Sequence, residues 1–182
     1  MVLCGQWVLT RVAKLSLACK ALGHNLQLLL HLHISICMHT TAVHLQDQQA
    51  TASLLNAKQI INTPNAPAPI GPYNQSVRAG NLLFISGQIP LDPATNELVS
   101  GSIEVEAHQC MKNLGAILQA AGASFDAVVK TTIFLSDMSL FAQVNEVYGS
   151  YFQQDFPARE TVAVKGLPKG VNVEISMIAS IS

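Results

Sequence analysis

The stretch VVKTTIFL, residues Val128 to Leu135, decides the fold, because it is the clearest candidate for a central strand. Almost all of its residues are apolar or Thr, and β-branched and aromatic side chains favour a buried, pleated backbone. Helical patterns flank it on both sides, at about residues 103–121 and 139–152. This order predicts a sheet that is covered by helices on its buried face.

The helix before this strand is predicted to run from about Ile103 to Ala121. Ser102 can cap its first turn, and Glu104 and Glu106 suit the positive end of a helix dipole. Gly122 is a natural stop, because glycine readily adopts the backbone conformation that ends many helices. Apolar residues recur at four-three-four-three spacing and form one stripe for packing on the sheet: Ala107, Met111, Leu114, Leu118 and Ala121.

The helix after the strand is predicted to start at Ser139, its expected cap, and to run through Phe152. Two strands are predicted to close the domain, Thr161–Val164 and Val171–Ile181, joined through a turn at residues 166–170. We expect these two strands to fold back on each other as a hairpin. The apolar face of the helix would contain four residues: Phe141, Val144, Tyr148 and Phe152.

Three strands are predicted before the first helix: Lys58–Ile61, then a hairpin of Ser76–Ala79 and Leu82–Ile89. Four prolines within residues 64–72 predict an ordered loop between them. The order β-β-β-α-β-α-β-β predicts an α+β fold, in which two helices cover one face of a six-stranded mixed sheet. The other face would expose apolar residues, which usually marks an interface, so we expect a closed homo-oligomer.

Charge separates residues 58–182 from the residues before them. Residues 58–182 hold seven Lys or Arg and ten Asp or Glu, so their formal net charge is −3. A mildly acidic domain without a basic run is a poor nucleic-acid binder. Cys110 is the one cysteine of this region, so it has no disulfide partner there, and a reducing compartment fits. Residues 58–182 contain no CxxC or Cys/His pair with zinc spacing, and we expect neither a metal nor a cofactor.

Residues 1–57 are predicted to be an N-terminal leader outside the folded domain. The first 46 residues lack Asp and Glu and hold Arg11, Lys14 and Lys20 among apolar residues. This composition resembles a mitochondrial transit peptide, which would direct the protein to the matrix; otherwise we expect the cytoplasm. The apolar run from Leu26 to Met38 is too short to span a bilayer. A leader that is never stably folded is the remaining alternative.

Five short segments point to one family of proteins. The segments are Ile70-Gly71-Pro72-Tyr73, Ser86-Gly87-Gln88-Ile89-Pro90, Lys130-Thr131-Thr132, Pro157-Ala158-Arg159, and Leu167-Pro168-Lys169-Gly170 followed by Val173-Glu174-Ile175. In the order and spacing of these segments, residues 58–182 resemble the RidA (YjgF) family of enamine and imine deaminases. The resemblance implies a chorismate-mutase-like fold and a homotrimer with an active site in each cleft between subunits.

The resemblance also implies a reaction. The substrates would be reactive imines of small 2-oxo acids, namely 2-aminoacrylate/2-iminopropanoate and 2-iminobutanoate. Hydrolysis would give the oxo acid and ammonia, and would protect pyridoxal-phosphate enzymes from these intermediates. Such a substrate has a carboxylate next to the C=N carbon, so catalysis needs a group that holds the carboxylate and a group that orients water.

Arg159 and Glu174 are the predicted catalytic residues. A guanidinium can hold a carboxylate through paired, charge-assisted hydrogen bonds, and a carboxylate can orient water or accept its proton. Alternation along the last strand sets Glu174 opposite its apolar neighbours, and alternation also points Glu160 away from Arg159. The expected hairpin would bring the two catalytic residues within roughly 10 Å at the backbone. Without the resemblance, each would more often be a solvent-facing residue.

Five further residues are predicted to line the substrate site. Tyr73 could cover the ligand or donate its hydroxyl, or it could be an ordinary interface tyrosine. Ser86 and Gly87 offer a hydroxyl and an open backbone N–H, or they mark a β-bulge. The resemblance makes Asn145 an amide donor. Thr161 stands where many relatives have Cys, which excludes a thiolate nucleophile but not hydrolysis by oriented water.

Two other functions stay open at the level of sequence. One is a non-enzymatic ligand-binding or chaperone-like protein on the same trimer, because a fold does not fix a function. The other is an RNA-cleaving translation inhibitor, which the acidic domain and the absence of a basic and aromatic surface disfavour. We expect neither nucleic acid nor a membrane as a partner.

Overall fold

The computed structural model describes residues 34–44, 46 and 58–181. Residues 34–44 and 46 are helical, and residues 58–181 belong to the second of two compact units. The basic residues Arg11, Lys14 and Lys20 lie outside the described residues, so the transit-peptide prediction stays a prediction. In the part of the chain that the structure describes, no helix has the length and apolar character needed to cross a membrane.

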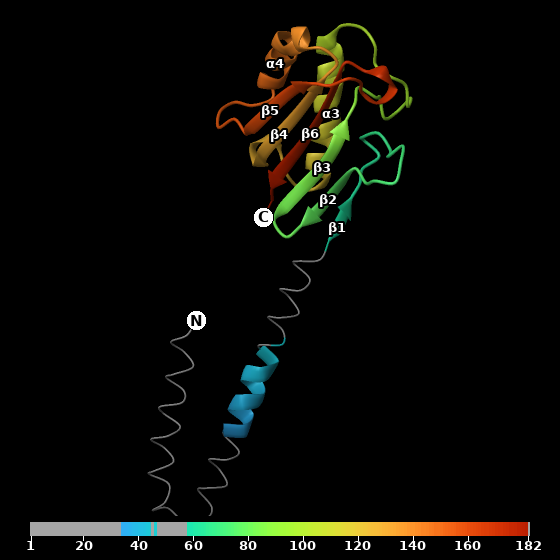
Figure 1. The fold of residues 1–182 in the computed structure, drawn as a ribbon. Helices are drawn as coiled ribbons and strands as arrows, with labels where there is room; N and C mark the ends of the chain where they lie inside the picture. The colour runs from blue at the N-terminus through green and yellow to red at the C-terminus, as the bar shows by residue number, and fades with distance from the viewer. Residues whose placement is uncertain (1–33, 45, 47–57, 182) are drawn as a thin grey trace, which may run out of the picture. The chain divides into compact units, whose positions relative to one another are not determined.

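Six strands form one mixed sheet in the order β1-β2-β3-β6-β4-β5 (Figure 1). All neighbouring strands are antiparallel except β4 and β5, which are parallel. The predicted stretch VVKTTIFL is β4, an interior strand between β6 and β5. The bounds are β1 Gln59–Ile61, β2 Ser76–Ala79, β3 Leu82–Gln88, β4 Val128–Leu135, β5 Ala158–Ala163 and β6 Val173–Ser180.

Two helices, α3 (Ile103–Ala120) and α4 (Phe141–Gly149), cover one face of this sheet (Figure 1). The predicted apolar stripe of α3 is its buried side, with Ala107, Met111, Leu114 and Leu118 all at 0% exposure. The helix packs on β6 and β3, and burial along β6 switches at every second position. The predicted α+β fold with two helices on one face of a six-stranded sheet is therefore confirmed.

The ends of the helices differ from the prediction in detail. Ser102 stands at the N-cap of α3, but its side chain makes no capping hydrogen bond. Gly122 follows the helix with a φ of +74°, as a glycine stop requires. Ser139 is not the cap of the second helix: the carboxylate of Asp137 accepts from the N–H of Ser139 at 2.8 Å, and caps a short 3-10 turn, η3 (Met138–Leu140), that leads into α4. Asp137, two residues earlier, is the better cap because its ionised carboxylate also interacts favourably with the positive end of the helix dipole.

The prediction of a closing hairpin is wrong. β4 lies between β5 and β6, and β5 pairs with β4 in parallel. The reason is the connection through α4, because a strand that returns by way of a helix can join its predecessor in parallel. β5 also begins at Ala158, so Arg159 lies within the strand and pairs with Thr131, whereas Glu174 of β6 pairs with Phe134.

The sheet face away from the helices exposes apolar side chains. Phe84 of β3 is 43% exposed and Val162 of β5 is 44% exposed. Phe134 and Ile178 on the strands between them are half-buried. Within residues 58–181 no helix covers this face (Figure 1). Such an uncovered apolar face agrees with the reason given above for expecting self-association.

Candidate active site

Arg159 lies in a cleft that we call the Arg159 cleft. Its guanidinium carbon is 4.9 Å from the ring centre of Tyr148 and 5.7 Å from that of Phe141, both on α4. These distances are those of a cation stacked on aromatic faces. Among the described residues, the one salt bridge joins Lys130 to Glu160, so no protein carboxylate pairs with Arg159. Its guanidinium is therefore positioned, yet open to an anionic ligand.

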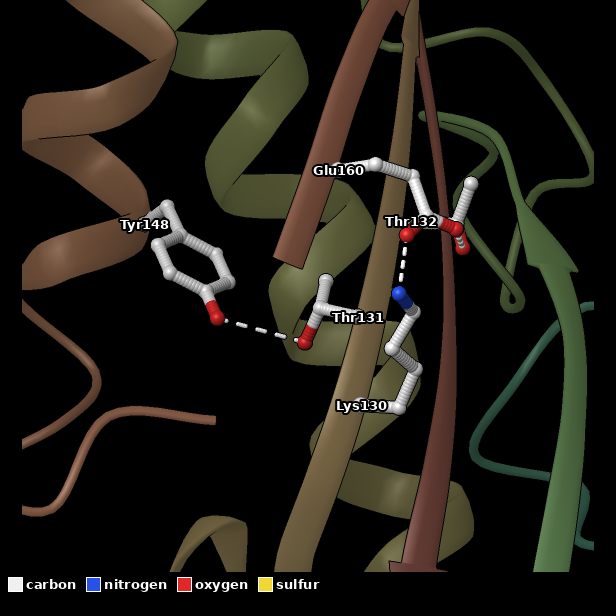
Figure 2. A network of polar contacts seen from close by, with 5 residues as sticks. All are labelled: Lys130, Thr131, Thr132, Tyr148 and Glu160. Atoms are coloured by element: carbon white, nitrogen blue, oxygen red, sulfur yellow. Dashed lines mark hydrogen bonds and ion pairs between the residues drawn. The ribbon is translucent and has the colours of Figure 1, made fainter. Parts of the chain in front are cut away.

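The walls of the Arg159 cleft are otherwise uncharged. The cleft has a volume of about 410 Å³ and is lined by Asn145, Tyr148, Gly149, Phe156, Pro157 and Arg159. The hydroxyl of Tyr148 donates to the hydroxyl oxygen of Thr131 at 3.2 Å (Figure 2). Burial raises the pKa of Tyr148, although the Thr131 hydrogen bond and the charge of Arg159 oppose this rise. Tyr148 therefore stays a neutral support for Arg159 at physiological pH.

Thr161 lies on β5 two residues beyond Arg159, so the two side chains share a face of the strand. The hydroxyl oxygen of Thr161 is buried and has no hydrogen-bond partner within the described residues. Glu160, between them, points to the opposite face, where it accepts from Lys130 and, at 2.7 Å, from the hydroxyl of Thr132 (Figure 2). The predicted orientation of Glu160 away from Arg159 is what the structure shows.

Glu174 lies in a second cleft, which we call the Glu174 cleft. This cleft has a volume of about 340 Å³ and brings together four of the predicted site residues with three apolar ones: Tyr73, Ser86, Gly87 and Glu174 with Ile70, Ile89 and Pro168. Burial raises the pKa of Glu174. No hydrogen bond or ion pair engages its carboxylate within the described residues. A carboxylate of raised pKa without a partner is suited to accept a proton from water.

Gly87 is required by the position of Glu174. A Cβ atom at residue 87 would overlap Oε1 of Glu174 and would lie 2.8 Å from its Cδ. The register between β3 and β6 also shifts between Ile85 and Gln88, so the strand has a bulge here. Both sequence interpretations of Gly87 therefore hold: it marks a bulge, and it leaves its backbone open to close approach.

Ser86 and Tyr73 are held by backbone groups. The hydroxyl of Ser86 donates to the carbonyl of Asn74 at 2.6 Å, which leaves only its oxygen lone pairs for a ligand. The hydroxyl of Tyr73 accepts from the N–H of Ile70 at 3.3 Å and keeps its own proton available. Tyr73 is 45% exposed, so its ring forms part of the rim of the Glu174 cleft.

Gln75, which the sequence analysis did not single out, fixes the proline loop that holds Tyr73. Its amide nitrogen donates to the carbonyls of Thr63, Ala66 and Pro67 at 2.9–3.0 Å, and its oxygen accepts from the N–H of Thr63 at 2.6 Å. The side chain is only 3% exposed. The one signal in the sequence was a polar residue directly before a strand and after the proline loop.

Arg159 and Glu174 do not meet within one chain. Their side chains point to opposite faces of the sheet, β4 lies between their strands, and the two clefts share no lining residue. The predicted convergence through a hairpin is therefore wrong. One cleft contains a cation without an acid, and the other contains an acid without a cation. Within the described residues, no group of three His, Cys, Asp or Glu could hold a metal ion.

The fold and the two clefts define an α+β domain of the chorismate-mutase-like kind, with an open arginine and a half-buried glutamate on opposite faces of its sheet. The family model described as Endoribonuclease L-PSP matches residues 63–181. The chain therefore belongs to this family, which is also called the RidA family.

Named relatives agree with this membership. The chain is 53% identical to a RutC family protein of Pyrococcus horikoshii over 122 residues, which cover 67% of this chain and 97% of that protein. It is 48% identical to the 2-iminobutanoate/2-iminopropanoate deaminase of Homo sapiens, over 67% of this chain and 89% of that protein. A solved structure of RidA from the Antarctic bacterium Psychrobacter sp. matches with a TM-score of 0.66 at 46% identity, covering 68% of this chain and 99% of that one.

Proposed function

We propose that this protein hydrolyses the reactive imines of small 2-oxo acids, 2-aminoacrylate/2-iminopropanoate and 2-iminobutanoate, to the oxo acid and ammonia. The observation that supports this most strongly is the pair of unpartnered, opposite charges: the open guanidinium of Arg159 and the carboxylate of Glu174 beside Gly87. An imino acid presents one group for each of them, an anionic carboxylate and an electrophilic carbon that water attacks.

The complete site requires two copies of the chain. We propose that the Arg159 cleft of one copy faces the Glu174 cleft of the next around a closed homotrimer, with the uncovered sheet face inside the assembly. The exposed Phe84 and Val162 on that face support burial against another copy. A head-to-tail arrangement uses different surfaces on the two partners, as two dissimilar clefts require.

The chemistry then follows from the charges. Arg159 holds the substrate carboxylate through its two parallel N–H groups, which fixes the C=N carbon in place. Glu174 of the neighbouring copy takes a proton from water as the water oxygen bonds to that carbon, and passes this proton to the nitrogen, which gives a carbinolamine. Glu174 then takes the proton of the carbinolamine hydroxyl while the amino group gains a proton, so the C–N bond breaks, ammonia leaves and the carbon–oxygen bond becomes the carbonyl of the oxo acid. The raised pKa of Glu174 makes it a stronger proton acceptor than an exposed glutamate.

Relatives support this choice of substrate. Proteins of Mus musculus, Homo sapiens and Bos taurus at 48–51% identity are named 2-iminobutanoate/2-iminopropanoate deaminase. A further relative at 42% identity, TdcF of E. coli, has been solved with bound serine, which has the same α-carboxylate that Arg159 would hold. A protective role toward pyridoxal-phosphate enzymes follows from this reaction, in the mitochondrial matrix if the leader is a transit peptide.

A coupled assay tests the proposal. A threonine dehydratase generates the imine, and this protein should accelerate its loss. Arg159→Ala should lower kcat/KM by about 100-fold or more, because the carboxylate loses its charge-assisted hydrogen bonds. Lys165→Ala is the matched control, since Lys165 is an exposed cation outside both clefts. An Arg159→Ala protein that clears imine at the wild-type rate would refute the role of Arg159.

The same experiment separates the two alternatives. A ligand-binding or chaperone-like protein would bind 2-oxobutanoate without any acceleration of imine loss. An RNA-cleaving protein would degrade single-stranded RNA. The wild-type protein would then not accelerate imine loss, so Arg159→Ala would leave the rate of imine loss unchanged. The acidic balance of residues 58–182 makes RNA the weaker candidate.

A further inference from the structure

Helix α3 has a polar row beside its buried apolar stripe. The row consists of Glu106, Gln109 and Asn113, which lie three and four residues apart and so share one side of the helix. Glu106 is 7% exposed and Asn113 is 1% exposed. Buried polar groups of this kind are costly unless they are hydrogen-bonded, so their partners show what they hold in place.

Glu106 holds the start of β6. Its Oε2 accepts from the backbone N–H of Asn172 at 3.1 Å, and its Oε1 accepts from the side-chain amide of Asn172 at 2.9 Å. Asn172 is bound from its other side by Ser136, whose hydroxyl and backbone N–H donate to it at 2.9 and 3.0 Å. Glu174 lies two residues further along the same backbone, so the clamp on Asn172 fixes the origin of the strand that bears Glu174.

The turn before Asn172 needs such an anchor. Pro168 lines the Glu174 cleft, and Lys169 and Gly170 follow it with φ of +55° and +71°. The left-handed conformation is strained for Lys169, because only glycine adopts it freely. Pro168, Lys169 and Gly170 are all exposed, so apolar burial contributes little to holding them. The hydrogen bonds of Asn172, together with the buried side chain of Val171, therefore restrain the chain where this turn enters β6.

Asn113 holds the opposite wall of the same cleft. Its amide nitrogen donates to the carbonyls of Ile89 and Leu91 at 3.2 and 2.9 Å, and Ile89 lines the Glu174 cleft. Gln109 donates to the side-chain oxygen of Asn113 at 2.9 Å, which fixes the orientation of that amide. One helix thus restrains both sides of the cleft from the interior of the domain.

We propose that Glu106 is a positioning residue for Glu174, acting through Asn172, and that Asn113 acts with it by fixing the wall at Ile89. This inference rests on the proposed function, because it concerns the geometry of the proton acceptor in imine hydrolysis. The hydrogen bonds of Glu106 go to Asn172 and to no residue that lines the Arg159 cleft. A substitution of Glu106 should therefore affect the reaction only through the Glu174 cleft.

A pair of substitutions that exchanges the carboxylate of residue 106 and the amide of residue 172 tests the proposal. Glu106→Gln replaces one acceptor oxygen by an NH₂ group. One of the two Asn172 donors, the backbone N–H or the side-chain amide, therefore loses its acceptor. In Asn172→Asp two carboxylates face each other. In the double variant the new amide of residue 106 donates to the new carboxylate of residue 172, while its oxygen still accepts the backbone N–H. The shape of the contact is thereby retained with one hydrogen bond reversed.

The readouts are kcat and KM for imine hydrolysis and the hydrogen exchange of a peptide spanning residues 167–175. We expect each single variant to lower kcat by about 10- to 100-fold, since small displacements of a reacting group cost that much. Exchange of the peptide should become faster, and the double variant should restore both. Leu118→Ala on the same helix is the control, because it opens a fully buried core site without touching the polar row. It should lower the melting temperature while kcat at 25 °C stays at the wild-type value.

The outcomes separate this inference from the proposed function. Single variants with wild-type kcat, or a double variant as slow as the singles, would overturn the positioning role. A wild type without imine hydrolysis would overturn the proposed function instead. In that case the affinity for 2-oxobutanoate replaces kcat as the readout: weaker binding in the single variants, restored in the double variant, supports the positioning of the cleft, and unchanged binding overturns it.

Discussion

Arg159 and Glu174 are prepared in different ways for the roles proposed for them. Arg159 is held by the faces of two aromatic rings, so its N–H groups stay directed at the cleft instead of being consumed by a protein carboxylate. Glu174 is held by close packing against Gly87, and burial raises the pKa of its carboxyl. In the proposed reaction, charge recognition thus depends on stacking in one cleft, and proton transfer depends on desolvation in the other.

Gly87→Ala tests the packing of Glu174. The added methyl would overlap the Glu174 carboxylate, which is the free end of a flexible side chain and can swing away. We therefore expect kcat to fall by about tenfold or more with a melting temperature close to the wild-type value. Gly166→Ala is the control, because a Cβ there meets no atom within 4 Å. Equal activity of the Gly87→Ala variant and the wild-type protein would contradict the proposed role of this contact.

Some of the site could be predicted from single residues, and some could not. Arg159, Glu174 and Gly87 belong to short segments with chemically distinctive side chains, so the sequence analysis identified them. Glu106 was assigned only to the positive end of a helix, because its partner Asn172 is 66 residues away in the sequence. Long-range hydrogen bonds of this kind leave no periodic pattern, and only the fold brings the partners together.

The elements of the sheet position these residues through register. The parallel pairing of β5 with β4 sets Arg159 beside Thr131 and directs Glu160 to the other face, toward Lys130. Strand and helix periodicity predicted nearly all elements, since apolar alternation and stripes are local signals. The pairing partner of β5 was mispredicted because a strand's neighbour depends on the path of the chain through α4, which local patterns do not encode.

Glu160→Gln tests the link between β4 and β5. Hydrogen bonds from Lys130 and then Thr132 lower the pKa of Glu160. A lowered pKa means that the folded state prefers the ionised form, so the stabilisation is present at neutral pH and is lost as pH falls through that lowered pKa. Thermal unfolding should show a slightly lower melting temperature for the Glu160→Gln variant at pH 7, and the difference should vanish in acid. A difference that grows on acidification would contradict this assignment.

Gln75→Glu tests the anchoring of the proline loop. The change keeps the shape of the side chain but replaces the NH₂ group that serves three carbonyls by an acceptor oxygen. We expect unfolding to become easier by about 2 kcal/mol or more, as for buried groups that lose their partners. Because the loop holds Tyr73, activity should fall as well. Denaturant unfolding measures the first effect, with the exposed Gln143→Glu as the control; equal stability of the two variants would exclude the anchoring role.

At the scale of the whole molecule, one chain provides two separate clefts, each with part of the proposed site, and an apolar sheet face. Helices α3 and α4 cover one face only, and the exposed Phe84 and Val162 mark the other. The sequence predicted this unequal coverage from the number of helices and strands. It did not predict that the proposed catalytic residues would lie on opposite faces, because that depends on the strand order. The closed assembly proposed above would account for both features at once.

The most direct test of the account is to combine two inactive proteins. Arg159→Ala and Glu174→Gln chains are unfolded together, refolded as mixed oligomers and assayed for imine hydrolysis. If each site takes Arg159 from one copy and Glu174 from the next, mixed assemblies contain intact sites and should recover about a quarter of the wild-type rate at equal mixing. If the mixture stays as inactive as each protein alone while mass spectrometry shows mixed oligomers, the shared site does not exist.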